Sequence, residues 1–188
     1  MLACVAAASA AVCVADNGWG PAAVYWDSGD WGDDVSPGLR IALELKPGLL
    51  LDLRYTALSS QYGRVAGRRT SVDDDMVEVG VASVRPMRRC DLYVGGGVGY
   101  HMMDAWVEGV RGDAADLYDD AWGWYGVLGV DAPICDRIPS INAERVTVFA
   151  ELLYRYVSLE ESDTGVRLSG APDKMDGPGA SVGLLLRW

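Results

Sequence analysis

Apolar residues alternate with polar or small residues along most of this chain, and this two-residue period limits the possible folds more than any other feature. The clearest example is residues 35–57, where two alternating segments flank the turn signal Lys46-Pro47-Gly48. Successive side chains of a β-strand point to opposite faces, so this stretch predicts a β-hairpin with one apolar and one charged face. The charged face carries Arg40, Glu44, Asp52 and Arg54.

The same alternation recurs in residues 75–85, 92–102, 121–131, 146–157 and 180–188, and a weaker candidate strand, Trp19 to Trp26, precedes them all. Each segment has about 9–11 residues, which is the length that a tilted strand needs to cross a bilayer. An even number of strands closes an antiparallel barrel with both ends on one side. We therefore predict an all-β fold, a closed antiparallel up-and-down transmembrane β-barrel of about eight strands.

The distribution of apolar residues favours a membrane barrel over a soluble barrel of the lipocalin kind. Hydrophobic residues make up 50% of the chain, yet after the N-terminus no run approaches the roughly 20 apolar residues of a membrane helix. The polar face is rich in glycine, which suits a narrow interior, and aromatic residues lie near both ends of the apolar face, as at the two interfaces of a bilayer. These aromatic residues are Tyr55, Tyr100, Trp122, Trp124, Tyr154 and Tyr156 at one end and Trp188 at the other.

The connections between the predicted strands alternate in length. Residues 46–48 and 86–91 are short, whereas residues 27–34, 59–74, 103–120 and 158–178 are longer and polar. Residues 132–145 are the exception, since they are long on the side where a short turn is expected. Short periplasmic turns and longer outer loops are typical of membrane barrels, so both termini are predicted to lie in the periplasm.

The first fifteen residues predict a cleaved signal peptide. They are almost all small or apolar, and Cys13-Val14-Ala15 before Asp16 is typical of a cleavage site. A basic start is missing, which leaves open a start codon further upstream, and a membrane anchor or a lipoprotein site at Cys4 or Cys13 are alternatives. We predict a signal peptide over 1–15 and a barrel domain over 16–188.

Two cysteines would remain after that cleavage. Cys90 precedes one predicted strand and Cys135 follows the next, so both are expected at the periplasmic rim. Because exported proteins meet an oxidising compartment, we predict a disulfide between them.

The charges on the inward face suggest how the interior is filled. Eight strands enclose a space just wide enough for side chains, and a lone charge in so narrow a space is very costly. A salt-bridged plug that fixes the fold is therefore the favoured interpretation, and a gate that opens a small ion pathway is the alternative. The predicted network contains Arg40, Glu44, Asp52, Arg54, Glu78, Glu151, Arg155 and Arg187.

The net charge of −11 and the sequence pI near 4.4 argue against nucleic-acid binding. Much of this charge is predicted to lie in acidic outer loops, and Asp73-Asp74-Asp75 is the densest run. No calcium-loop motif accompanies it, so we predict no metal site. The glycine-rich run 95–99 falls within a strand and not between a strand and a helix, so neither a nucleotide site nor any other cofactor is predicted.

The final strand carries a resemblance to a known class of proteins. It ends Val182-Gly183-Leu184-Leu185-Leu186-Arg187-Trp188, an alternating run that closes on a terminal aromatic residue. Together with the strand pattern, this resembles the small eight-stranded outer-membrane β-barrels of the OmpA/OmpX type, over nearly the whole mature chain. The resemblance implies an outer-membrane location, with lipid and lipopolysaccharide around the barrel and recognition of the last strand by the barrel-assembly machinery. It covers an architecture and not a family motif, so no binding residues follow from it.

Three functions remain open. A structural or surface-interaction barrel is favoured, because the sequence shows no catalytic constellation; any extracellular ligand is unknown. A narrow pore is the first alternative. A lipid A-modifying enzyme is the second, because outer-membrane deacylases and palmitoyltransferases use a histidine and His101 is the single histidine of this chain. No serine stands two residues from His101 on the same face, so an enzyme is disfavoured.

Overall fold

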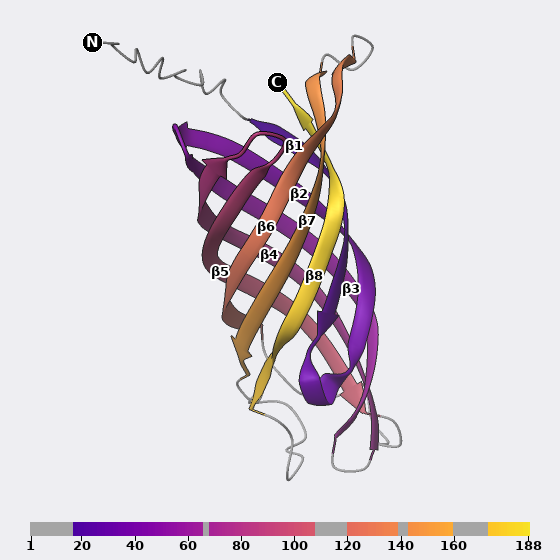
Figure 1. Cartoon of the computed structure of the whole chain (residues 1–188). Helices are drawn as coiled ribbons and strands as arrows, with labels where there is room; N and C mark the ends of the chain where they lie inside the picture. The colour runs from indigo at the N-terminus through magenta and orange to yellow at the C-terminus, as the bar shows by residue number, and fades with distance from the viewer. Residues whose placement is uncertain (1–16, 66–67, 108–119, 139–142, 160–172) are drawn as a thin grey trace, which may run out of the picture.

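The chain forms a closed eight-stranded barrel in which every strand is antiparallel to its neighbours and β8 closes against β1 (Figure 1). The computed structural model describes residues 17–65, 68–107, 120–138, 143–159 and 173–188. The predicted fold class is therefore confirmed. The strands are β1 (Gly18–Asp27), β2 (Asp33–Lys46), β3 (Leu49–Val65), β4 (Arg68–Pro86), β5 (Asp91–Val107), β6 (Ala121–Ile138), β7 (Ala143–Ser158) and β8 (Lys174–Arg187), and the 3-10 helix η1 (Gly29–Trp31) joins β1 to β2.

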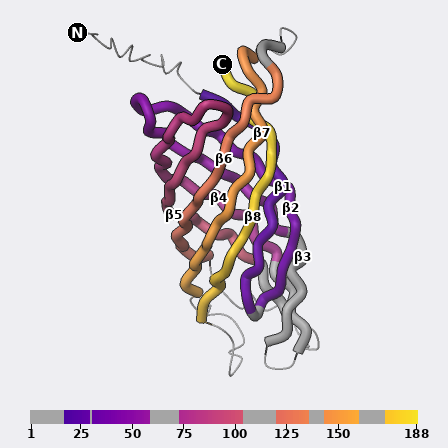
Figure 2. The backbone as a smooth tube through the Cα atoms, in the orientation of Figure 1, coloured from indigo at the N-terminus to yellow at the C-terminus, as the bar shows by residue number. Residues whose placement is uncertain are grey.

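The β2–β3 hairpin forms at the predicted turn. Leu43 pairs with Leu51 across it, and Gly48 adopts a φ of 79°, a left-handed conformation that glycine reaches without strain. The start of β1 and the end of β8 lie at the rim that carries this turn, where the Trp188 N–H donates to the Asn17 carbonyl at 3.1 Å (Figure 2). We call this rim the turn side and the opposite rim the loop side.

The barrel is apolar outside and charged inside. Leu152 and Val79, on the outer face, are 66% and 42% exposed, whereas their neighbours Glu151 and Glu78 are buried. Leu184 is exposed as well, and Leu43 and Leu51 are half-buried on the same outer face. A soluble barrel would have the opposite arrangement, so the exterior is that of a barrel surrounded by lipid. Within the described residues, no helix has both the length and the apolar character needed to cross a membrane.

Two segments predicted as connections are strand instead. β3 and β4 continue to Val65 and Arg68 on the loop side, and β6 and β7 continue past the turn-side rim as a hairpin that projects beyond the barrel (Figure 1). In both segments polar residues occupy both faces of the sequence pattern. A strand that leaves the bilayer has no apolar face to bury, so alternation disappears while backbone pairing continues.

The expected disulfide is not formed, since both Cys90 and Cys135 lie in described parts of the chain and no bond joins them. Strand β5 stops pairing with β6 at Asp91 and Asp131, and Cys135 lies four residues further along the projecting β6–β7 hairpin. Four residues of strand at about 3.3 Å per residue therefore separate Cys135 from the last β5–β6 pair, which places it beyond the rim where Cys90 lies. The prediction was wrong because it ended β6 at residue 131.

Candidate functional site: the closed barrel interior

The centre of the interior is held by Arg54, which reaches across the barrel from β3. Its Nη1 and Nη2 donate to Glu151 Oε2 and Oε1 of β7 at 2.7 and 2.8 Å. Its Nε donates to Asp52 Oδ2 at 2.8 Å. A guanidinium that binds one carboxylate with two parallel hydrogen bonds fixes both distance and orientation, so this contact sets the separation of two opposite walls.

Arg40 of β2 binds the same two carboxylates from another side. Its Nε donates to Asp52 Oδ1 at 3.0 Å, and its Nη1 lies 3.2 Å from Glu151 Oε1. Tyr93 of β5 completes this group, because its hydroxyl donates to Glu151 Oε1 at 2.7 Å and accepts from Arg40 Nη1 at 2.9 Å. Asp52 and Glu151 thus each contact two arginines.

Two further ion pairs lie on either side of this centre. Arg155 of β7 donates from Nε and Nη2 to Glu78 Oε1 and Oε2 of β4, at 2.8 and 2.9 Å. Arg187 of β8 binds Asp131 of β6 near the turn side. The network then holds four arginines and four carboxylates, each 7% exposed or less, and carries no net charge. Buried charges are tolerated when each has such partners.

Aromatic rings fill the space beside the charges. The Arg40 guanidinium carbon lies 4.6 Å from the centre of the Tyr93 ring and 4.9 Å from that of Phe149. Glycines on the neighbouring strands make room for these rings, since a Cβ at Gly129 would lie 2.3 Å from Tyr93 and one at Gly183 would lie 2.7 Å from Phe149. The glycine-rich inner face of the sequence therefore has a packing cause.

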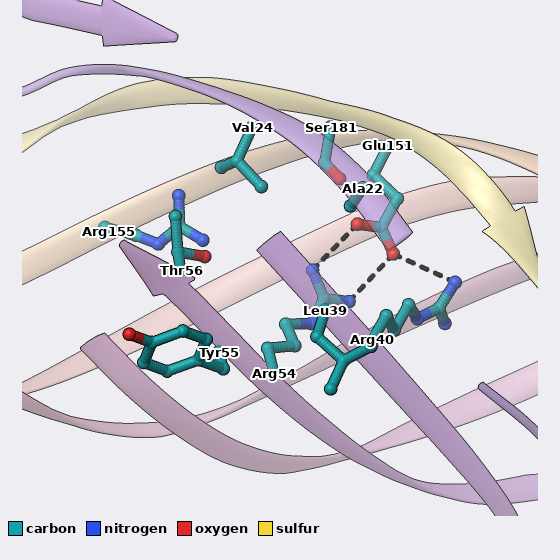
Figure 3. A pocket seen from close by; sticks show the side chains of 10 residues that line it. All are labelled: Ala22, Val24, Leu39, Arg40, Arg54, Tyr55, Thr56, Glu151, Arg155 and Ser181. Carbon is teal, nitrogen blue, oxygen red and sulfur yellow. Dashed lines mark hydrogen bonds and ion pairs between the residues drawn. The ribbon is translucent and has the colours of Figure 1, made fainter. Parts of the chain in front are cut away.

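A small cavity lies beside the network, next to Arg54, Glu151 and Arg155 (Figure 3). Its volume is about 10 Å³. That is close to the minimum of about 10–15 Å³ needed for a single water molecule. It is far too small to serve as a channel.

Above the network, toward the loop side, His101 of β5 pairs with Asp74 of β4. His101 Nδ1 lies 2.8 Å from Asp74 Oδ2, and both side chains are buried. Asp74 was predicted to lie in an outer acidic loop, but it belongs to a strand and points inward. The sequence carried this signal, because Asp74 has the same parity as the inward-facing Met76 and Glu78.

The loop-side end of the interior is closed by an apolar plug. Trp31 of η1 is fully buried in it, as is Trp26 of β1. Gly29 and Gly32 flank this tryptophan with φ angles of 73° and 98°, which form the tight turn that points it inward. We define the plug by its buried members, which are Trp26, Trp31, Leu58, Met76, Met103, Ala121, Val157, Leu159 and Met175.

The structure brings together all of the predicted interior charges except one. Glu44 lies half-buried at the turn-side end of β2, where its backbone N–H donates to Asn17 Oδ1 at 2.9 Å. Asp131 was missed in the sequence, although it shares the inward parity of Tyr125 and Gly129. The predicted signal peptide, 1–15, lies outside the described residues, as do the acidic loop residues Glu108, Asp113, Asp116, Asp119, Glu160, Glu161 and Asp163. Within the described residues, no group of three or more acidic, histidine or cysteine side chains is arranged to hold a metal ion.

No protein-family model and no curated protein sequence matches this chain. Solved structures match it over nearly its whole length. The outer membrane protein OprG from Pseudomonas aeruginosa is 14% identical, with 93% of this chain and 96% of that chain covered and a TM-score of 0.61. Neisserial surface protein A (NspA) is 12% identical, with 92% and 96% covered and a TM-score of 0.57.

A third match is Ail, the attachment invasion locus protein of Yersinia pestis, which is 13% identical, with 93% and 97% covered and a TM-score of 0.51. At such low identity these likenesses show a shared fold. The predicted resemblance to small eight-stranded outer-membrane barrels is confirmed at that level.

Proposed function

We propose that this chain is an outer-membrane β-barrel protein with a structural or surface-interaction role, whose interior is closed to solutes. The observation that carries the proposal is the ion-paired network, which spans the barrel between opposite walls. Arg54 links β3 to β7, and Arg155 links β7 to β4. With the loop-side end also filled by the apolar plug, the surface of the barrel and its loops are left for interaction with partners.

The outer membrane is the location that best fits the exterior. Exposed valine and leucine cover the wall, and Trp122 and Trp188 lie exposed toward opposite rims. We propose that the turn side and both termini face the periplasm and that the acidic loops face outward. On this proposal residues 1–15 direct export, the last strand ending at Trp188 is recognised by the barrel-assembly machinery, and lipopolysaccharide surrounds the loop side.

The two alternative functions have less support. A pore would require the four arginines and four carboxylates to separate, which would leave buried charges without partners. For an enzyme, the Asp74–His101 pair supplies a base and its orienting carboxylate. However, within the described residues no hydroxyl group is hydrogen-bonded to His101, and the centre of the Trp26 ring of the apolar plug lies 6.0 Å from that of the His101 ring.

Planar-bilayer recording of the purified protein tests the proposal. The unmodified barrel is expected to give no conductance steps. The double variant Glu78→Ala/Arg155→Ala removes one complete ion pair without leaving a lone charge, so it should introduce small steps. Asp176→Ala/Lys174→Ala removes an exposed pair at the loop-side rim and should remain silent. Regular steps from the unmodified protein would contradict the proposal in favour of a pore.

The membrane location has its own test in the outer face of β7. Leu152→Arg should reduce the free energy of unfolding from lipid vesicles by about 2–4 kcal/mol, the cost of a basic side chain near mid-bilayer. The measurement is urea unfolding followed by tryptophan fluorescence. Glu144→Lys is the control. Glu144 is exposed near the turn-side end of the same strand, so this change should alter the free energy of unfolding little. Equal effects of the two variants would show that Leu152 does not face lipid.

A further inference from the structure

One sector of the outer wall, near the loop side, carries a cluster of aromatic rings. Trp122 and Trp124 of β6 are 65% and 51% exposed. The Trp122 ring centre lies 5.0 Å from that of Tyr100 on β5, and the Trp124 ring stacks on Tyr156 of β7 at 5.7 Å with an interplanar angle of 20°. We define the aromatic patch as Tyr100, Trp122, Trp124, Tyr154 and Tyr156.

Carboxylates border this patch on the side of the loops. The Tyr100 hydroxyl donates to Asp120 Oδ2 at 2.8 Å, and the Tyr154 hydroxyl donates to Asp176 Oδ2 at 2.9 Å. The Met103 N–H donates to Asp120 Oδ1 at 3.3 Å, which holds that carboxylate in place. Each aspartate is therefore hydrogen-bonded to a tyrosine of the patch at its loop-side border.

The Tyr–Asp pair repeats in every loop-side hairpin of the barrel. The Tyr55 hydroxyl donates to Asp75 Oδ1 at 2.9 Å in the β3–β4 hairpin, and Tyr25 is hydrogen-bonded to Asp33 in the β1–β2 hairpin. These two pairs lack tryptophan on the adjacent outward positions, where Val77 faces Tyr55 and Val35 faces Tyr25. All four loop-side hairpins thus carry the same Tyr–Asp hydrogen bond, but exposed tryptophan rings lie beside it only in the sector around β6.

The charge around the patch selects among possible partners. Lys174 lies 3.1 Å from Asp176, but no described basic side chain pairs with Asp120. A carboxylate can accept about four hydrogen bonds, so Asp120 and Asp176 retain acceptor capacity after binding tyrosine. Asp120 would repel an anionic phosphate, whereas both aspartates can accept hydrogen bonds from neutral hydroxyl groups. Flat apolar rings beside carboxylate acceptors are the chemistry that binds a sugar, whose C–H face packs on the ring while its hydroxyls donate.

We propose that the aromatic patch binds the saccharide headgroup of a glycolipid in the outer leaflet. One sugar packs against Trp122 and another against Trp124, and their hydroxyl groups donate to Asp120 and Asp176. The site recognises the sugar of the lipid and not its phosphate. This inference rests on the proposed location of the loop side at the outer leaflet, where indole and phenol rings favour the interface between hydrocarbon and water.

The experiment measures how much neutral glycolipid the barrel retains. The full chain is placed in vesicles of phosphatidylcholine mixed with digalactosyldiacylglycerol, extracted gently, and analysed by mass spectrometry for bound lipid. We expect severalfold enrichment of the galactolipid over its share of the vesicle. Asp120→Ala and the double variant Trp122→Leu/Trp124→Leu should each abolish most of that enrichment.

Asp75→Ala is the matched control, because it removes an equivalent carboxylate from a Tyr–Asp pair that has no tryptophan beside it. It should retain the galactolipid. Equal loss in Asp75→Ala or no enrichment in the unmodified protein would each overturn the inference. Preferential retention of phosphatidylglycerol, when that lipid is added to the vesicles, would overturn it as well. If the tryptophan variant fails to insert, Asp120→Ala against Asp75→Ala decides the matter.

The conductance recording separates this inference from the proposed function. An inserted and silent barrel that shows no preference for galactolipid overturns the aromatic patch alone. A chain that does not insert, or that conducts, overturns the proposed function.

Discussion

The interior of this barrel is closed in two different ways. In the middle and toward the turn side, arginines and carboxylates from six of the strands form a neutral network. Toward the loop side, nine buried residues form an apolar plug that includes a tryptophan from η1. Both regions fill the interior and bring together strands that are not neighbours, but only the network joins them by ion pairs.

The difference teaches what each closure contributes. Well-packed apolar residues of similar volume are often as stabilising as a buried ion pair, so stability alone does not account for the network. Directed hydrogen bonds such as those of Arg54 to Glu151 accept one geometry only, and they fix which wall lies opposite which. Apolar contacts in the plug have no such direction, so that region can adapt to change.

The strongest test of this contrast is Arg54→Ala. It leaves Asp52 and Glu151 close together with Arg40 as their shared cation, and we expect the free energy of unfolding to fall by about 3–5 kcal/mol. Urea unfolding in vesicles measures the loss. Arg54→Lys keeps the charge but not the two parallel hydrogen bonds. Its free energy of unfolding should lie between those of the unmodified protein and Arg54→Ala. A loss under about 1 kcal/mol, the size expected for a surface pair, would indicate that water already reaches these carboxylates.

Truncation of the plug tests the other region. Met76→Ala removes a fully buried side chain, and we expect a loss of about 2–4 kcal/mol, at the lower end if the neighbouring methionines move into the space. The matched variant Met102→Ala, on the exposed face of the adjacent strand, should cost less. Planar-bilayer recording of Met76→Ala should remain silent, because the ion-paired network is still in place. Conductance in this variant would show that the plug, and not the network, closes the barrel.

The same contrast explains how far the sequence alone could lead. Alternation identified the strands inside the bilayer and the inward side of Arg40, Asp52 and Glu151, because lipid on one side and a narrow interior on the other impose opposite chemistry on successive residues. It failed where that constraint ends. The β6–β7 extension that carries Cys135 beyond the rim has polar residues on both faces and no alternating pattern, so its strands, and with them the absence of a disulfide, could not be predicted.

The partners within the network were also beyond the sequence. Parity places Glu78 and Arg155 inside, but only the stagger of the closed barrel brings β4 and β7 into contact there. The inward direction of Asp131 and Asp74 could have been found by continuing the parity of their strands past the last apolar residue. The burial of Trp31 could not have been found in this way, because it depends on a three-residue helix in a connection.

The smallest effect is expected from Lys174→Ala, which removes an ion pair of the same chemical kind at the loop-side rim. Lys174 Nζ lies 3.1 Å from Asp176 Oδ1, with 48% and 28% of the two side chains exposed. Water screens such a pair and the Tyr154 hydroxyl still binds the aspartate, so unfolding measurements should show a smaller loss than any of the other variants. Raised salt should reduce even this loss, while leaving the effect of Arg54→Ala unchanged. A loss as large as that of Arg54→Ala would mean that the rim pair lies in lipid, and the bilayer boundary would then have to be placed nearer the loops than the aromatic patch indicates.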